Sequence, residues 1–457
     1  MYRKQLLFLK DWYEKKDRKP LIVRGARQVG KSTLIKLFAE QLGSELAEVN
    51  LERHVNLNKV FTSKNPKAIL SELEDLLEVS ITGKSILFLD EIQSTPEAIP
   101  ALRYFYEETG LPIVGAGSLL EFVLSHHKFS MPVGRINYLH MGPLLFSEFL
   151  NAMGEERLLV KLGGYKLGAS LTTALHEKYS ETLRQFLFVG GMPEAVKHFA
   201  MSQNFKDASE VHRSILDTYQ EDFPKYIGSR DAARVLNVFN YAARSVGQKV
   251  KYANFARDEQ SVTIKKDIEL LSLARVISKV THSSCNGLPL QAENDPRVYK
   301  LLFLDVGLVN SLLGLNWTNI RSFSGTQLVN EGPIAEQFVG QHLLDYLSDK
   351  ANRGLNYWLR EGKGKNAEVD YVISLGGKIV PIEVKSGSSG ALRSLHQFMG
   401  EKSLPVAIRL DTNKPSVQKI ETFYRVGTDK RPVSYTLITL PLYLVEKIPE
   451  VVEDWYS

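Results

Sequence analysis

The chain has 457 residues, of which 44% are hydrophobic and 24% charged, with a formal net charge of +5. This length exceeds what one compact core usually holds and predicts two to four domains of a globular protein. The single cysteine, Cys285, excludes an intrachain disulfide framework and a cysteine-rich zinc site. No apolar run is long enough to span a membrane and the start is too charged for a secretory signal, so we expect a cytoplasmic protein with no membrane partner.

Residues 1–150 are expected to form an α/β domain built on a parallel sheet, with residues 1–19 as a charged amphipathic lead-in. PLIVRGARQVGKSTLIKLFAEQL predicts an apolar strand, a glycine-bounded loop and a helix. SILFLDEIQ and LPIVGAGS predict two further apolar strands. Apolar strands that alternate with helical segments are typical of a parallel sheet covered on both faces.

The loop GARQVGKS matches the phosphate-binding pattern G-x-x-x-x-G-K-[ST] and lies between a strand and a helix, the context that this pattern requires. Its backbone N–H groups would surround phosphate oxygens at the positive end of the helix. Lys31 would reach the β and γ phosphates of ATP, and Ser32 would ligate Mg²⁺. The predicted nucleotide contacts in this loop are Gly25, Ala26, Arg27, Gln28, Val29, Gly30, Lys31, Ser32 and Thr33.

An acidic pair follows the second apolar strand. Asp90, at the carboxyl end of that strand, would supply a second Mg²⁺ contact and belong to the nucleotide site. Glu91 would orient the water that attacks the γ-phosphate. We therefore expect hydrolysis of ATP in addition to binding.

Over residues 20–150 these motifs resemble the AAA+ superfamily of P-loop ATPases. The resemblance implies a polar sensor at the end of the next strand, where this chain has Ser118 in place of the usual Asn. It also implies an arginine directed at the γ-phosphate, for which Arg135 is the first candidate and Arg103 the second. Either arginine could instead pair with a surface acid. Because a neighbouring copy often supplies this arginine in the superfamily, a homo-oligomer is a further expectation.

The middle of the chain is expected to be helical and basic. Residues 151–232, interrupted by FVGGMPEAV, are interpreted as a helical lid or linker. Residues 233–300 follow the order of a winged helix-turn-helix, with Thr263–Leu273 as its recognition helix. From position 225 to 300 there are 13 Lys and Arg against 7 Asp and Glu, which suits DNA binding but also an ordinary solvated face.

In this module Lys265 and Lys266, with Lys279 and His282 in the wing, are the candidate contacts to DNA phosphates. The alternative is that the module serves as a lid or a protein contact.

Residues 301–457 are expected to place three charged side chains together. Glu383 and Lys385 lie two residues apart on one strand and point the same way, and Asp370 lies on the preceding strand of a hairpin. Two converging carboxylates can hold Mg²⁺ or Mn²⁺, and Glu336 could supply a further one. Lys385 would orient an attacking water or stabilise a phosphate. The alternative is an ordinary hairpin with a salt bridge between Glu383 and Lys385.

This segment is similar to the PD-(D/E)XK nuclease superfamily, with Glu336, Asp370, Glu383 and Lys385 at matching positions and Gln397 on the following helix. The whole chain resembles bacterial and archaeal AAA ATPases that carry a C-terminal domain of uncharacterised function with this nuclease-like core. The supporting segments are RKPLIVRGARQVGKST, LFLDEIQ, VGRI followed by PLLFSEF, FVGGMPEAV, LLFLDVGL and IEVKSG.

Two functions remain open at this point. The first is Mg²⁺-dependent ATP hydrolysis coupled to DNA engagement, with or without cleavage. The second is a nucleotide-dependent interaction switch whose nuclease-like domain is an inactive binding platform. The predicted catalytic residues are Lys31, Glu91, Arg135, Glu383 and Lys385, and the predicted metal ligands are Ser32, Asp90, Glu336, Asp370 and Glu383.

Overall fold

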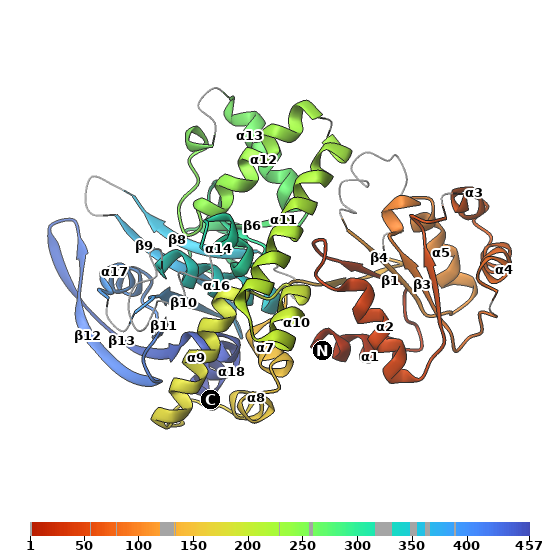
Figure 1. Ribbon diagram of the computed structural model, residues 1–457. Coiled ribbons are helices and arrows are strands. Elements are labelled where there is room, and N and C mark those ends of the chain that lie inside the picture. Colours follow the sequence, from red (N-terminus) through yellow and green to blue (C-terminus); the bar gives the residue numbers. More distant parts are fainter. Residues whose placement is uncertain are drawn as a thin grey trace. The chain divides into compact units, whose positions relative to one another are not determined.

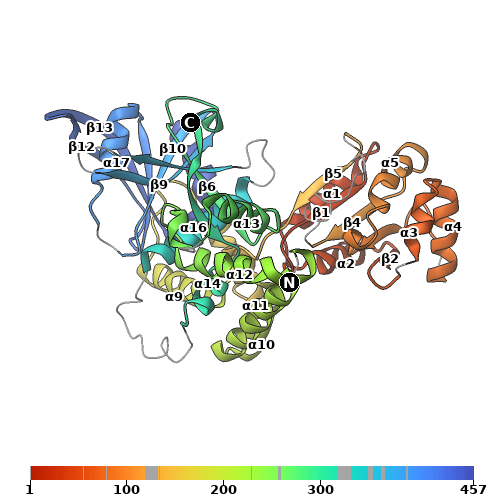
Figure 2. The same ribbon diagram turned by 90° about the horizontal axis from the view of Figure 1, so that it is seen from above.

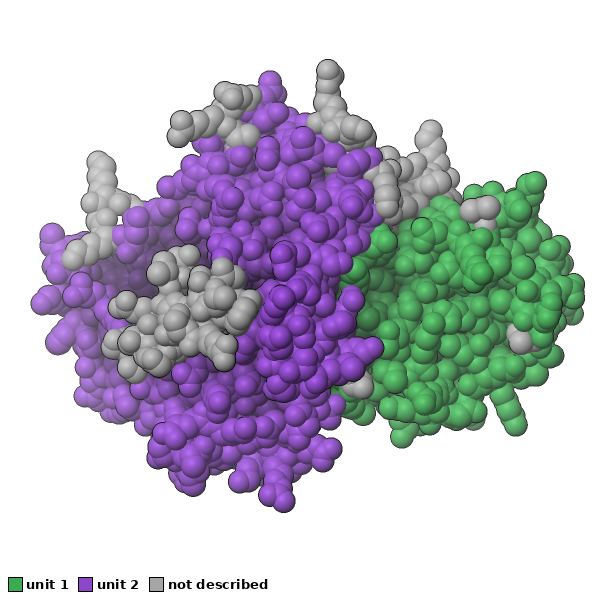
Figure 3. Space-filling model, in the orientation of Figure 1, with its two compact units in different colours: residues 1–144, 269–276 green, residues 145–268, 277–457 purple. Residues whose placement is uncertain are grey.

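The computed structural model describes residues 2–54, 56–78, 80–118, 132, 134–227, 229–255, 259–315, 331–347, 354–361, 366–387 and 390–457 (Figure 1). The chain divides into two compact units (Figure 3). The first comprises residues 1–144 and 269–276, and the second comprises residues 145–268 and 277–457. No helix in the described ranges is long and apolar enough to cross a membrane.

The first unit is built on a parallel sheet with the strand order β2-β3-β4-β1-β5. Figure 2 shows β1 beside β4 and β5 in this sheet. Strands β3 and β4 are buried at every position, as their uninterrupted apolar sequences predict. The expected parallel sheet is thus confirmed. Its strands are Leu21–Arg24 (β1), Leu46–Asn50 (β2), Ile86–Asp90 (β3), Ile113–Gly117 (β4) and Asn137–His140 (β5). Its helices are Gln5–Glu14 (α1), Lys31–Leu42 (α2), Leu57–Thr62 (α3), Pro66–Leu77 (α4) and Ala98–Glu108 (α5).

The second unit begins with a run of helices. They are Phe146–Ala152 (α7), Glu156–Gly163 (α8), Thr173–Val189 (α9), Pro193–Ser202 (α10), Phe205–Ile227 (α11), Ser229–Arg244 (α12) and Ser261–Leu273 (α13). The last residues of α13, from Glu269 on, belong to the first unit. The expected turn in FVGGMPEAV separates α9 from α10, and Gly190 there has a left-handed φ of +68°. The carboxylate of Asp305 accepts a hydrogen bond from the N–H of Gly191 (2.7 Å), which fixes this turn against the start of Val306–Leu312 (α14).

The second unit also contains a mixed sheet with the order β12-β13-β11-β10-β9-β8-β6-β7. Its strands are Ile277–Ser283 (β6), Asn294–Phe303 (β7), Leu355–Arg360 (β8), Ala367–Leu375 (β9), Lys378–Val384 (β10), Val406–Asp411 (β11), Ser416–Val426 (β12) and Asp429–Pro441 (β13). Glu331–Leu347 (α16), Arg393–Lys402 (α17) and Ile448–Tyr456 (α18) complete the unit. The hairpin β9–β10, the helix α17 and the strand β11 follow in the order expected for the C-terminal segment.

The expected winged module has the predicted order of elements but not a sheet of its own. Strands β6 and β7 pair with each other, and β6 also pairs with β8, so both belong to the eight-stranded sheet. Arg234 on α12 binds the carboxylate of Asp267 on α13 through two nitrogens, at 2.6 and 3.1 Å. The apolar residues Ile264 and Ile268 are buried, as the amphipathic pattern predicts. The winged helix itself stays a prediction.

Candidate functional site: the nucleotide loop and a buried acidic cluster

The predicted phosphate-binding loop connects β1 to α2 and depends on its glycines. Gly30 has a φ of +91°, in the left-handed region that glycine adopts without strain. A side chain at Gly25 would collide with the carbonyl oxygen of Met141. The two glycines of the motif are therefore required by the conformation of the loop backbone. Gln28 is a second residue with a left-handed φ, of +63°. This path sets the loop at the N-terminus of α2, where anions bind favourably.

Lys31 is folded back over this loop. Its ammonium donates to the carbonyl oxygens of Gly25 at 3.2 Å and Ala26 at 2.8 Å. Both acceptors belong to the loop that the motif assigns to phosphates. A bound phosphate would offer charged oxygens in place of these neutral acceptors, which is the role that the motif predicts for Lys31.

The two predicted Mg²⁺ ligands of the first unit touch each other. The hydroxyl of Ser32, at the start of α2, donates to Asp90 Oδ1 at the end of β3 over 2.9 Å. Burial raises the pKa of Asp90, although the hydrogen bond from Ser32 acts in the opposite direction. A hydroxyl and a carboxylate at this separation provide hard oxygen ligands of the kind that Mg²⁺ takes. The residues present thus fit the ion that the motif implies.

Glu91 is held by a neighbour that the sequence analysis missed. It adopts a left-handed conformation (φ +53°), and the side-chain amide of Gln93 donates to Glu91 Oε2 at 2.5 Å. A side chain at Gly117, the last residue of β4, would collide with Gln93. The sequence feature that could have indicated this contact is the glutamine two residues after the acidic pair in LFLDEIQ. Ser118 follows Gly117 directly and is buried. Because β4 lies between β1 and β3, Ser118 lies between the phosphate-binding loop after β1 and the acidic pair after β3.

Neither candidate arginine is unpaired. Arg135 lies 3.2 Å from Glu107 on α5 and close to the ring of Tyr106, and Arg103 lies 3.1 Å from the same carboxylate. Both arginines therefore make the surface ion pair that was the alternative to a γ-phosphate contact. The identity of the arginine that would complete the nucleotide site stays a prediction.

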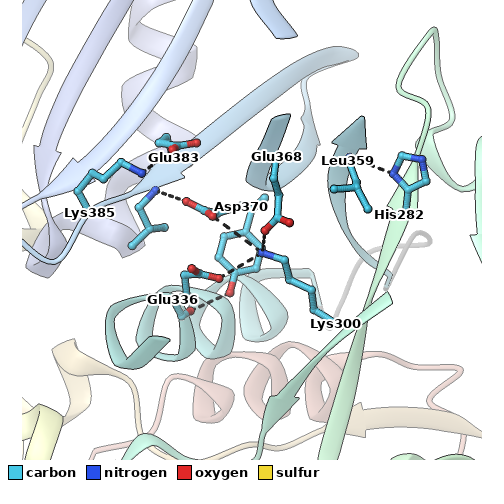
Figure 4. Close-up of polar contacts among 10 residues, drawn as sticks. His282, Lys300, Glu336, Leu359, Glu368, Asp370, Glu383 and Lys385 are labelled. Atoms are coloured by element: carbon cyan, nitrogen blue, oxygen red, sulfur yellow. Dashed lines mark hydrogen bonds and ion pairs between the residues drawn. The ribbon is translucent and has the colours of Figure 1, made fainter. Parts of the chain in front are cut away.

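In the second unit, three carboxylates surround a buried lysine, and a fourth carboxylate, bound by Lys385, completes the cluster (Figure 4). Glu336 comes from α16, Glu368 and Asp370 from β9, and Glu383 from β10. The ammonium of Lys300, on β7, lies 3.3 Å from Glu336 Oε2 and 3.9 Å from Asp370 Oδ1, and it also binds Glu368. Lys300 is only 2% exposed. The cation at the centre of the predicted metal site is therefore a lysine that the sequence analysis did not single out.

Two further contacts complete this cluster. Lys385 binds Glu383 Oε1 at 2.6 Å, and Asp370 Oδ2 accepts from the N–H of Val384 at 2.7 Å. Glu383 Oε2 is buried and has no hydrogen-bond partner among the described residues. The hairpin thus brings Asp370, Glu383 and Lys385 together as predicted. It also makes the Glu383–Lys385 salt bridge that was the alternative interpretation.

Burial and charge act against each other in this cluster. Burial raises the pKa of Glu336 and of Glu383 to about 8, because it outweighs the opposing effects of Lys300 and Lys385. For Lys300, burial lowers the pKa, but the carboxylates Glu336, Asp370 and Glu368 outweigh burial and the pKa is raised. With every group ionised, four carboxylates and two ammonium groups leave an excess of two negative charges. Two protons or one divalent cation would neutralise that excess.

The metal-ligand prediction for the second unit fits this geometry poorly. Within the described ranges, no group of three or more His, Cys, Asp and Glu side chains is arranged to hold a metal ion. A metal bound by Glu336, Asp370 and Glu383 would have to share the cluster with the Lys300 ammonium. Gln397, expected on the helix near the cluster, instead binds Glu401 and the backbone of Arg425.

The predicted DNA contacts divide into two kinds. Lys265 and Lys266 are exposed on α13. His282 accepts a hydrogen bond from the N–H of Leu359 through Nδ1, and burial lowers its pKa, so it is neutral and engaged within the sheet. Lys279 lies over the ring of Tyr299. Of the four predicted DNA contacts, only Lys265 and Lys266 are thus exposed to solvent as expected.

Comparisons with known proteins identify the first unit. Residues 17–150 match the family model described as an AAA domain. Residues 180–319 and 331–428 each match a domain of unknown function, DUF8612 and DUF4143 respectively. No curated protein matches the chain in sequence. The match and the loop geometry together show that the N-terminal part is an AAA-type P-loop domain, as predicted.

Similar solved structures include the ORC2 protein of Aeropyrum pernix in ADPNP–ADP complexes. It has 13% identity and a TM-score of 0.34, over 69% of this chain and 92% of that one. The ADP form of the same protein has 12% identity and a TM-score of 0.31, over 70% and 96%. AMPPCP-bound DnaA from Aquifex aeolicus has 10% identity and a TM-score of 0.26, over 59% and 87%. Likeness at this level carries no argument about function.

Proposed function

We propose that the AAA domain binds and hydrolyses ATP in a Mg²⁺-dependent reaction. The observation that carries this proposal is the 2.9 Å contact between Ser32 Oγ and Asp90 Oδ1, with Glu91 next in the chain. Lys31 would bind the β and γ phosphates, and Ser32 and Asp90 would hold Mg²⁺, which neutralises phosphate charge. Glu91, oriented by Gln93, would align the attacking water and accept its proton.

The test compares Lys31→Ala and Glu91→Gln with wild type in ATP binding and in turnover. Lys31→Ala should lose binding, and Glu91→Gln should bind ATP but turn it over about 100-fold more slowly. Lys36→Ala is a matched control, because Lys36 lies on the same helix and pairs with Glu48 on the surface. Normal turnover in both Lys31→Ala and Glu91→Gln would reject the proposal.

For the second unit we favour the interaction switch over the nuclease. The observation is the buried ammonium of Lys300, which lies among the carboxylates of Glu336, Glu368 and Asp370 at the place where a metal would bind. A filled, salt-bridged cluster suits a stable platform, since catalysis by two carboxylates needs them open to metal and substrate. The platform would engage DNA through the lysines of α13, with an affinity that changes with the nucleotide state of the AAA domain.

The platform is tested by DNA binding over a range of salt concentrations, with ADP or a non-hydrolysable ATP analogue. The double variant Lys265→Glu/Lys266→Glu should weaken binding and reduce its salt dependence. Equal affinity of wild type and this variant would reject α13 as the contact. Equal affinity in both nucleotide states would reject the switch.

Metal-dependent DNA cleavage is the second candidate. It is favoured by Glu383 Oε2, a buried oxygen beside Asp370 and Lys385 that has no hydrogen-bond partner in the part of the chain that the structure describes. Plasmid and single-stranded DNA would be incubated with Mn²⁺ or Mg²⁺, with and without ATP. Cleavage by wild type that is lost in Asp370→Ala and in Lys385→Ala would establish the nuclease. Absence of cleavage with ATP hydrolysis intact would leave the platform as the function of this unit.

A further inference from the structure

Strand β12 is an edge strand whose outward face is exposed. It pairs with β13 on one side only and lies at the end of the eight-stranded sheet (Figure 1). On one face, Tyr424 packs against Gly400 of α17. On the other face, Phe423 is 62% exposed and Val417 is 48% exposed, which is unusual for large apolar side chains on an open edge. Between them lie Lys419 and Glu421, joined by an exposed ion pair of 2.6 Å.

The direction of the backbone groups along β12 follows from one contact. The side-chain amide of Gln397 donates to the carbonyl oxygen of Arg425 (2.8 Å) and accepts from its N–H (3.1 Å). These two groups therefore point away from β13. Because backbone groups alternate along an antiparallel strand, the N–H and C=O groups of residues 417, 419, 421 and 423 also point to the open edge. Gln397 closes the edge at Arg425. Among the described residues no strand pairs with this side of residues 417, 419, 421 and 423, so their backbone groups can bind another strand.

The sequence of this edge is complementary to itself. In an antiparallel pair of identical strands related by a two-fold axis, a register centred on Ile420 places Lys419 opposite Glu421 of the second copy. The same register places Val417 opposite Phe423. It also places Arg425, whose backbone already binds Gln397, opposite Pro415, which has no N–H to donate.

Neighbouring registers do not satisfy these side chains. A register centred on Lys419 or on Glu421 places that charged residue opposite its own copy. A register centred on Thr422 places Lys419 opposite Arg425, which has the same charge. A register centred on Gln418 places Lys419 opposite Val417 and leaves Glu421 opposite Pro415. Charges of both signs commonly protect a sheet edge. Here they are spaced so that one antiparallel register pairs every charge and every apolar side chain of residues 417–423.

We propose that two copies of this chain associate through β12, in antiparallel register centred on Ile420, so that their eight-stranded sheets form one continuous sheet across a two-fold axis. Cross-strand pairs of Lys419 with Glu421 and of Val417 with Phe423 fix the register, and backbone hydrogen bonds from the open edge hold the strands. The interface is small, so the dimer is expected to dissociate with a constant of about 10 μM. This association does not depend on the proposed ATPase activity.

The test is a charge-reversal series on the full chain without nucleotide, followed by sedimentation velocity from about 1 to about 100 μM. Lys419→Glu and Glu421→Lys each place like charges opposite one another, so each variant alone should be monomeric. Mixed in equal amounts, the two variants carry opposite charges at both positions and should form a heterodimer. The double variant Lys419→Glu/Glu421→Lys should dimerise like wild type.

Lys430→Glu is the matched control, since it makes the same charge change on the exposed part of β13, away from the open edge. It should leave the dimer intact. A wild type that stays monomeric at the highest concentration would overturn the proposal, and so would dimers that persist in both single variants. Failure of the mixture to associate would overturn the register. The substituted side chains are exposed, and circular dichroism of each variant checks that it is folded.

Discussion

Lys300 determines the chemistry of the acidic cluster because it is the cation that Glu336, Glu368 and Asp370 share. Lys300→Met would keep much of the side-chain volume and leave these carboxylates without their central charge. Removing one partner of a buried ion pair typically costs about 3 kcal/mol. We therefore expect the free energy of unfolding of the second unit to fall by about 3 kcal/mol at pH 7, measured by urea denaturation.

Lys266→Met is the control for this substitution. Lys266 is exposed on α13, where a lysine can be replaced with little effect. A loss below about 1 kcal/mol in Lys300→Met would contradict the assigned role, because the carboxylates would then be stable without the lysine.

The same cluster shows what sequence can and cannot reveal at this scale. The convergence of Asp370, Glu383 and Lys385 follows from the alternation of side chains on two strands of one hairpin, which is local information. Lys300 lies on β7, 36 residues before Glu336 on α16, so no local pattern connects them. The sequence feature that could have indicated Lys300 is its position in VYKLLF, where a lysine interrupts an otherwise apolar strand.

Asp305 is the residue from which we expect a distinct pH dependence. It is fully buried at the start of α14 and accepts from the N–H groups of Gly191, Gly307 and Leu308. Burial raises its pKa to about 6, although these hydrogen bonds act in the opposite direction. Between about pH 4 and pH 6 the folded protein therefore keeps a proton that the unfolded chain releases. Its contribution to stability is full below that window and is lost as the pH rises through it.

Asp305→Asn removes this titration together with part of the helix cap. The loss of stability relative to wild type should be largest near pH 4 and should shrink by up to about 3 kcal/mol by pH 7. Urea denaturation of both proteins at several pH values measures this difference. A difference that does not change with pH would show that Asp305 does not titrate in this range.

At the scale of elements, two glycine-containing segments far apart in sequence hold each other in place. Gly190, in the turn between α9 and α10, has a left-handed φ of +68°, and a side chain there would collide with Asp305. A side chain at Gly307 would lie 2.9 Å from His212 Nε2 on α11. These two close contacts therefore fix the turn, the start of α14 and α11 against one another. The sequence shows both segments as motifs, but their contact is visible only in the fold.

Gly190→Ala should disrupt this contact. The alanine meets both the left-handed backbone and the Asp305 carboxylate, so we expect a loss of about 3 kcal/mol or more. Gly163→Ala is the matched control, because Gly163 ends α8 with open space around it and should be neutral or slightly stabilising. Thermal unfolding of the two variants measures the difference. Equal melting temperatures would contradict the assigned contact.

The elements themselves were largely predictable, and their grouping was not. Periodicity identified β1, β3, β4 and the hairpin β9–β10, because each has a long apolar or alternating pattern. The same reasoning assigned β6 and β7 to a separate wing, since two adjacent strands after two helices are locally indistinguishable from one. The pairing of β6 with β8 depends on residues more than 70 positions later. Local sequence carries no information on such a distant partner.

At the scale of the whole molecule, nucleotide should act on one compact unit. All the proposed ATP contacts lie in the unit of residues 1–144 and 269–276. A ligand that binds only the folded form of that unit raises its free energy of unfolding by about 2.7 kcal/mol at 100 times its dissociation constant. Differential scanning calorimetry with Mg²⁺ and a non-hydrolysable ATP analogue should therefore shift one transition upward and leave a second one in place.

Lys31→Ala provides the control for this experiment, because it removes the phosphate contact and should remove the shift. Lys300→Met should instead lower the melting temperature of the transition that nucleotide leaves unchanged. A single transition that nucleotide shifts as a whole would show that the two units unfold together. In that case the free energy of nucleotide binding would stabilise the entire chain, and a change at the phosphate-binding loop would affect the stability of both units.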